Sequence, residues 1–131
     1  MTQGIGQQSL HADMNAGRHS LVSGLSPKLG GLDEGPDPHA LLEASLVACT
    51  ILTLQLYANH KQWDLGSITV DAHIESETKE GTRLLRTIRF GKELPSKQVE
   101  RLTEIANKCP IHNLLVGKVD ITTSVLLDAR K

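Results

Sequence analysis

The sequence is poor in aromatic residues and has no excess of either charge. One Trp, one Tyr and one Phe occur among 131 residues, too few for a platform on which single-stranded nucleic acid stacks. Fourteen basic and fifteen acidic residues give a formal net charge of −1, and the basic ones are scattered, which weighs against any nucleic-acid partner. The longest apolar run, which begins at Leu41, is shorter than a membrane span and contains Glu43 and Gln55, so no membrane partner is expected.

Cysteine is also scarce, and the two present are Cys49 and Cys109. The first six residues lack the charged and apolar regions of a signal peptide. We therefore expect a cytoplasmic protein, in which a disulfide would be transient and functional rather than structural. The length is close to the commonest size of a single domain, and we expect one domain over residues 1–131.

Alternation, turn and capping signals in the first half predict a hairpin followed by a helix. Residues 8–14 alternate weakly, a turn signal covers 15–18, and residues 19–25 predict the second arm. A loop rich in Gly, Pro and Asp spans 26–37. Asp37-Pro38 is typical of an N-cap with proline at the first helical position, and the helix is predicted to end near Lys61. It is apolar around most of its circumference, which indicates a core helix.

The second half predicts a hairpin, two helices and a last strand. Strict alternation over 67–75 predicts the clearest strand, and its partner spans 83–90, where Arg86 interrupts the apolar face. Apolar residues at helical spacing predict a helix over about 95–108. A short helix can start at Pro110, and alternation over 119–127 predicts the final strand. The expected fold class is α+β, with an antiparallel sheet wrapped around one buried central helix.

Cys49 lies within the predicted core helix and shares a face with Leu42, Leu46 and Leu52. A buried cysteine often behaves only as a small apolar residue. Burial also raises the pKa of a thiol, so reactivity at this position would require a cation that stabilises the thiolate. The helix pattern alone leaves both interpretations open.

Cys109 lies at a helix boundary, directly before Pro110. Because proline cannot continue the preceding hydrogen-bond ladder, Cys109 is expected to end one helix and cap the next, where the free backbone amides favour a thiolate. The alternative is a small residue that fills a corner between helices. His112, three residues further on, could face the thiol.

Two segments resemble motifs of the OsmC/Ohr proteins. The first is Gly35-Pro36-Asp37-Pro38-His39-Ala40-Leu41-Leu42, followed by Ala44 and Ala48-Cys49-Thr50. The second is Cys109-Pro110-Ile111-His112, followed by Leu114. The order of elements fits as well, so the resemblance covers essentially the whole chain. The continuation Leu56-Tyr57-Ala58 looks closer to the broader OsmC-like branch than to the organic-hydroperoxide-resistance branch.

The resemblance implies a thiol-dependent peroxidase that defends against oxidative stress and acts as an intertwined homodimer with sites at the subunit interface. Carried over by motif, Cys49 attacks the hydroperoxide and Cys109 resolves the resulting sulfenic acid into a disulfide. Arg18 occupies the place of the family's arginine that holds the thiolate. A dithiol would serve as reductant, and no cofactor or metal is needed because the thiolate itself attacks the O–O bond.

The sequence departs from the family at His39. Peroxidase members often carry a glutamate just after the helix-starting proline, and that glutamate orients the arginine. Glu43 lies one turn further on but points to a different face of the helix from Cys49. We expect His39, Glu43 and His112 at the substrate-binding site.

Other functions remain open from the sequence. A small-molecule or thiol-adduct binding protein with little turnover is the main alternative, and His39 is the feature that favours it. A metal site built from Cys49, Cys109 and His112 ranks last, because these residues do not form the usual closed ligand set. A Cys-His hydrolase would need an oxyanion hole, and no glycine-rich turn adjoins Cys49.

Overall fold

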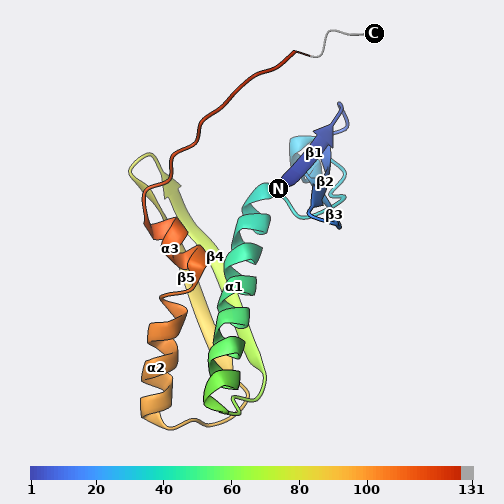
Figure 1. The fold of residues 1–131 in the computed structure, drawn as a ribbon. Coiled ribbons are helices and arrows are strands. Elements are labelled where there is room, and N and C mark those ends of the chain that lie inside the picture. Colours follow the sequence, from blue (N-terminus) through green and yellow to red (C-terminus); the bar gives the residue numbers. More distant parts are fainter. Residues whose placement is uncertain (128–131) are drawn as a thin grey trace.

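The computed structural model describes residues 1–127 and begins with a small antiparallel sheet. Its strands are β1 (Thr2–Gly6), β2 (His11–Ala16) and β3 (His19–Gly24), in the order β1-β2-β3. The predicted hairpin is confirmed, with its turn at Gly17, whose φ is 61°, whereas β1 was not predicted. In Figure 1 this sheet lies beyond the N-terminal end of the long helix, apart from the other elements.

The long helix α1 (Pro38–Lys61) begins and ends as its capping residues dictate. The Asp37 side chain accepts a hydrogen bond of 2.8 Å from the Ala40 backbone amide, and Pro38 occupies the first turn. Gln62 ends the helix in the left-handed conformation, with φ 60°. The predicted bounds of this helix are confirmed.

Only one stripe of α1 is buried within the chain, formed by Leu46, Thr50, Leu54 and Ala58 at every fourth position. Leu56, by contrast, is 73% exposed. The helix predicted to be apolar around most of its circumference is therefore covered along only one face by its own chain. The reason is that the chain's other elements pack on one side of α1 only.

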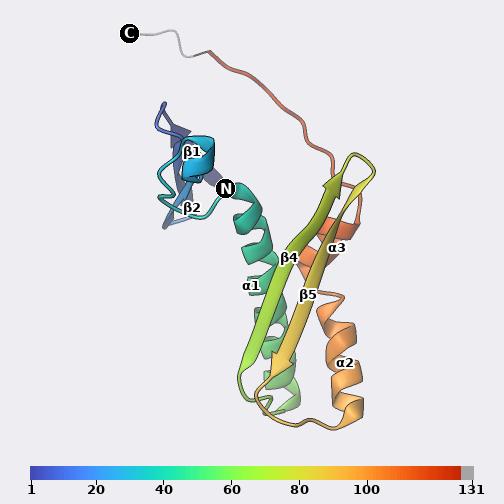
Figure 2. The same cartoon turned by 180° about the vertical axis from the view of Figure 1, so that it is seen from behind.

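A hairpin and two helices complete the body of the fold. They are β4 (Ile68–Thr78), β5 (Gly81–Phe90), α2 (Ser96–Ala106) and α3 (Pro110–Val116). Figures 1 and 2 show α1 and α2 side by side on one face of the β4–β5 hairpin, with α3 next to them. The core lies between these layers and comprises Leu54, Ala58, Leu65, Leu102 and Ala106, with Tyr57, Trp63, Ile68, Ile88, Phe90, Leu94 and Ile105 packed against it.

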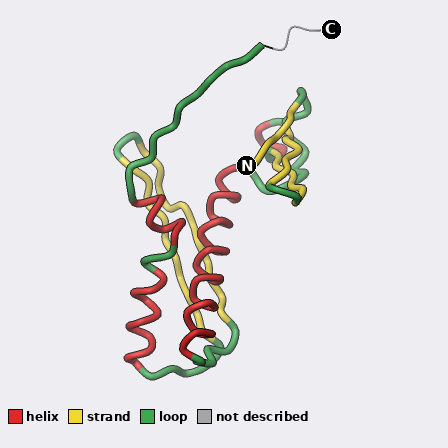
Figure 3. The backbone as a smooth tube through the Cα atoms, in the orientation of Figure 1, coloured by secondary structure: helices red, strands yellow, loops and turns green. Residues whose placement is uncertain are grey.

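The final strand predicted over residues 119–127 is wrong. In the structure this segment has no regular secondary structure and leads away from the body as an extended loop (Figure 3). Its alternating apolar residues remain exposed, with Ile121 at 83% and Val125 at 80%. Alternation produces a strand only where a neighbouring strand supplies hydrogen-bond partners, and among residues 1–127 none of the strands pairs with this segment.

By length and composition alone, α1 could also cross a membrane. This differs from the expectation from the sequence that the longest apolar run is shorter than a membrane span. The core helix of a folded domain meets the same criterion, and α1 packs against β4, α2 and α3.

Candidate active site

The structure brings the two cysteines together. Cys49 lies near the middle of α1 and Cys109 lies at the start of α3, and both are free thiols. The Cys109 thiol and the Ile111 backbone amide are close enough to the Cys49 sulfur to lower its pKa. The Cys49 sulfur also lies 3.8 Å from the Thr53 hydroxyl oxygen. The proximity of the two thiols is what the two-cysteine interpretation of the sequence requires.

The surroundings of Cys49 favour its thiolate. Burial raises the pKa of the Cys49 thiol, but hydrogen bonds from the Ile111 amide and the Cys109 thiol act in the opposite direction. A hydrogen bond from Thr53 and the positive charge of Arg86 lower it further. The net result is a Cys49 pKa below that of an ordinary cysteine. The cation that the sequence analysis called for is therefore present, and it is Arg86.

Cys109 is the N-cap of α3, as predicted. Its backbone is extended, with φ −63° and ψ 146°, and its sulfur accepts a 3.4 Å hydrogen bond from the His112 backbone amide. Cys109 is 0% exposed, whereas Cys49 is half-buried. Of the two thiols, Cys49 is therefore the one that is accessible to solvent.

Arg86 interrupts the apolar face of its strand, and the sequence alone predicted no role for it. It lies on the inward face of β5 between the half-buried Leu84 and Ile88. Its Nη1 donates to the Thr50 hydroxyl at 3.2 Å, and its Nη2 donates to the Asn107 side-chain oxygen at 2.8 Å. The available signal was the charge that interrupts an apolar strand face, because such a charge is costly unless the fold gives it partners.

His112 adjoins the same group of residues. Burial, and then the positive charge of Arg86, lower the pKa of its imidazole, which is therefore neutral at neutral pH. Beside it is an open cleft of about 810 Å³. The side chains that line the cleft include the apolar Leu46, Leu84 and Leu115, the basic Arg83 and Arg86, His112 and the acidic Glu80.

The other predicted site residues lie elsewhere in the chain. Arg18 is exposed in the β2–β3 turn, in the sheet that stands apart from the cysteines (Figure 1). His39 pairs with Glu77 at 2.8 Å. It precedes Cys49 by ten residues, which is about 15 Å along a helix. The Glu43 carboxylate accepts a 2.8 Å hydrogen bond from the backbone of β4. A role for these three residues at the site stays a prediction.

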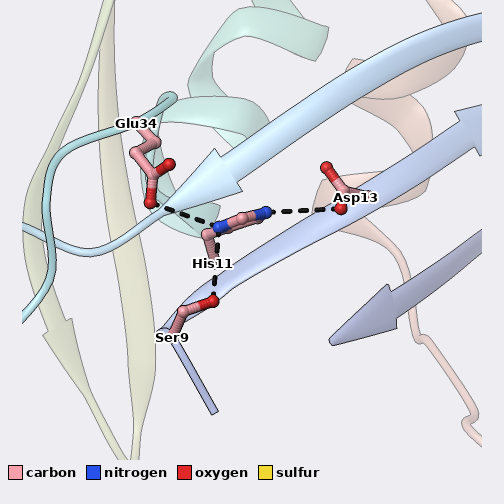
Figure 4. A network of polar contacts seen from close by, with 4 residues as sticks. All are labelled: Ser9, His11, Asp13 and Glu34. Carbon is pink, nitrogen blue, oxygen red and sulfur yellow. Dashed lines mark hydrogen bonds and ion pairs between the residues drawn. The ribbon is translucent and has the colours of Figure 1, made fainter. Parts of the chain in front are cut away.

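A second polar cluster ties the N-terminal sheet to the loop before α1 (Figure 4). His11 contacts Asp13 at 3.3 Å on its own strand and Glu34 at 3.2 Å on the loop. The hydrogen bond to Asp13 raises the pKa of His11, and the charges of both carboxylates add to the effect although burial opposes it. The Ser9 hydroxyl lies 3.5 Å from the same imidazole. The imidazole of His11 is half-buried, and its contacts are among those that hold the loop against the sheet, together with the hydrogen bond from the Ser23 hydroxyl to the Pro36 carbonyl.

Known structures share this fold. A Psychrobacter arcticus protein described as an "osmotic stress induced and detoxification response protein" superposes with a TM-score of 0.75 at 19% identity, over 86% of this chain and 85% of that one. An organic hydroperoxide resistance protein OsmC from Legionella pneumophila gives 0.65 at 22% identity, over 92% and 90%. The organic hydroperoxide resistance protein OhrB of Bacillus subtilis gives 0.64 at 19% identity, over 92% of each chain.

The sequence comparison points the same way. No protein of curated function matches the chain in sequence. The family model described as OsmC-like protein matches residues 31–124, which include both cysteines and every element from α1 to α3. The fold is accordingly the α+β OsmC-like fold, with antiparallel sheets and a central helix, and the resemblance seen in the two motifs is confirmed. The chain belongs to the OsmC-like protein family.

Proposed function

We propose that the protein is a thiol-dependent peroxidase that reduces hydroperoxides through Cys49. One observation carries the proposal: a half-buried thiol with a lowered pKa lies near a second, fully buried thiol. Reactive cysteines are found in such partly exposed, electropositive surroundings. Family membership supports the same chemistry, and two of the structural neighbours are described as organic hydroperoxide resistance proteins.

The proposed reaction needs only the two thiols, a hydroperoxide and a dithiol. The Cys49 thiolate attacks the outer oxygen of the hydroperoxide, the O–O bond breaks, and the alkoxide leaves as an alcohol after it takes up a proton. Cys49 is then a sulfenic acid. The Cys109 sulfur attacks it, a disulfide forms, and the hydroxyl leaves as water. A dithiol reduces the disulfide and is itself oxidised, which restores both thiols.

The proposal includes a homodimer in which the partner subunit covers apolar surface that remains exposed in one chain. The uncovered side of α1 and the unpaired apolar segment over 119–127 are the observations in its favour. Arg18 lies in the turn between β2 and β3, in a sheet that stands apart from the body of its own chain (Figure 1), so it would act at the site of the partner subunit. We propose an interface on the order of 2,000 Å² or more, typical of obligate homodimers.

Steady-state reduction of cumene hydroperoxide with dithiothreitol tests the proposal. We expect consumption of the hydroperoxide that depends on the protein and that Cys49→Ser abolishes, because an alcohol is a far weaker nucleophile than a thiolate. Consumption by the unmodified protein no faster than that by Cys49→Ser would contradict the peroxidase. A small-molecule binding protein would then be the better explanation. The feature that favours such a binding protein is His39. In the structure the His39 imidazole pairs with the Glu77 carboxylate.

A further inference from the structure

We infer that Arg86 is a positioning residue of the redox site, which holds the segment of Cys49 and the segment of Cys109 in register with one another. The inference rests on the proposed function. It concerns a residue that neither of the two cysteine motifs includes, on a strand that carries neither cysteine.

One guanidinium connects both cysteine-bearing segments. Thr50, the acceptor of Nη1 at 3.2 Å, directly follows Cys49 on α1. Asn107, the acceptor of Nη2 at 2.8 Å, lies two residues before Cys109. The donors of an arginine form a rigid planar fork, so the two hydrogen bonds fix the α1 backbone against the junction of α2 and α3.

The anchor on α1 is itself rigid. Thr50 is 0% exposed, and its hydroxyl donates a 2.7 Å hydrogen bond to the Leu46 carbonyl while it accepts from Arg86. The hydroxyl hydrogen of Thr50 is thus already used in the hydrogen bond to Leu46. The helix therefore fixes the orientation of the hydroxyl oxygen that accepts from Arg86. A movement of Arg86 would consequently leave a buried hydroxyl with poorer hydrogen bonding, which is unfavourable.

The charge of Arg86 is not neutralised by a carboxylate. Among the ion pairs of residues 1–127, Arg83 pairs with Glu75 at 3.1 Å and Arg89 pairs with Asp71 at 2.7 Å, whereas none involves Arg86. Both of its partners are neutral side chains that leave its positive charge in place. The cation is therefore free to interact with a thiolate, and its effect extends to the pKa of Cys49 and of His112.

The pairing of β4 with β5 also leaves space for the Arg86 side chain. The cross-strand partner of Arg86 is Ala72, whose small side chain leaves room on the inward face of the hairpin. A leucine or isoleucine at position 86 would continue the apolar face of Leu84 and Ile88 without any cost of desolvation. Packing alone would therefore favour an apolar residue over arginine at position 86. The two side chains that accept hydrogen bonds from Arg86, Thr50 and Asn107, lie close in sequence to the two cysteines.

The first test measures the Cys49 thiol without peroxide. In a Cys109→Ser background, so that Cys49 is the only thiol, the rate of alkylation by neutral iodoacetamide is followed against pH. We expect Arg86→Gln to move the midpoint to higher pH and to slow alkylation at pH 7 several-fold, since an adjacent cation stabilises the thiolate. Arg89→Gln removes the same charge from the outer face of the same strand and should change neither quantity.

The second test measures positioning, with Cys109 intact. After one addition of hydroperoxide, the lifetime of the sulfenic acid is followed by dimedone trapping and mass spectrometry. Arg86→Lys keeps the charge but not the fork, so it should retain most of the alkylation rate and still lengthen the lifetime several-fold. Asn107→Ala changes an exposed residue and should also lengthen the lifetime, with its alkylation midpoint near that of the unmodified protein. Circular dichroism checks that each variant is folded.

Three outcomes separate the possibilities. An unchanged alkylation midpoint in Arg86→Gln, or unchanged sulfenic acid lifetimes in Arg86→Lys and Asn107→Ala, would overturn the inference. If Arg86→Gln fails to fold, the Arg86→Lys and Asn107→Ala lifetimes decide in its place. If no variant or unmodified protein consumes peroxide, the proposed function fails, and the alkylation profile still decides whether Arg86 acts on Cys49.

Discussion

Leu56→Glu should dissociate the proposed homodimer. Leu56 is 73% exposed on α1 in the single chain. Complete burial of a leucine side chain contributes about 1.5–3 kcal/mol, so coverage of this exposed fraction contributes about 1–2 kcal/mol per subunit. In a symmetric dimer the residue occurs twice, which gives about 2–4 kcal/mol. At about 1.4 kcal/mol per factor of ten, the dissociation constant should rise about 30- to 700-fold, and the desolvation of two carboxylates adds to this.

Sedimentation velocity at micromolar concentration measures the effect. Glutamate is a good helix former, so the variant should keep the fold of the chain. Thr69→Glu is a matched control, because Thr69 is exposed on β4 and lies opposite Arg89 on the polar outer face of the hairpin. A stable monomer for the unmodified protein would refute the reasoning, and so would equal dissociation by the two variants.

Three further predictions follow from the described contacts. Leu54→Ala, at a fully buried core position, should lower the free energy of unfolding by about 2–5 kcal/mol, as measured by urea denaturation; an effect under ~1 kcal/mol would contradict the packing. Asp37→Ala removes the cap of α1 and should cost about 1 kcal/mol in the same assay, whereas no loss would mean that the cap is not formed. Because the pKa of Cys49 is lowered, its alkylation should persist below the pH range of an ordinary cysteine and be lost as the pH falls through that lowered value; a midpoint at or above the ordinary one would contradict the site.

Local signals in the sequence were sufficient for much of the fold. The Asp37-Pro38 pair predicted the start of α1, alternation predicted the β4–β5 hairpin, and Pro110 placed Cys109 at a helix cap. Each signal acts within a few residues of the chain, through a side-chain cap, a strand period or a missing amide. These are the features that one sequence specifies by itself.

The features that depend on distant partners were not predictable in the same way. Residues 119–127 do alternate between apolar and polar side chains, but a strand also needs a neighbouring strand to pair with, and none of the strands in residues 1–127 pairs with them. The role of Arg86 depends on its approach to Thr50 and Asn107, 36 and 21 residues away in the sequence. Its interruption of an apolar face was visible, whereas the identity of its partners required the fold.

The most direct test of the central claim locates the first oxidation. Each single-cysteine variant receives one equivalent of cumene hydroperoxide with dimedone present, and mass spectrometry identifies the modified residue. We predict that Cys109→Ser consumes the peroxide and carries the adduct on Cys49, and that Cys49→Ser consumes none, since Cys109 is fully buried. An adduct on Cys109 in the Cys49→Ser protein, with Cys109→Ser inert to peroxide, would contradict the assignment of Cys49 as the attacking thiol.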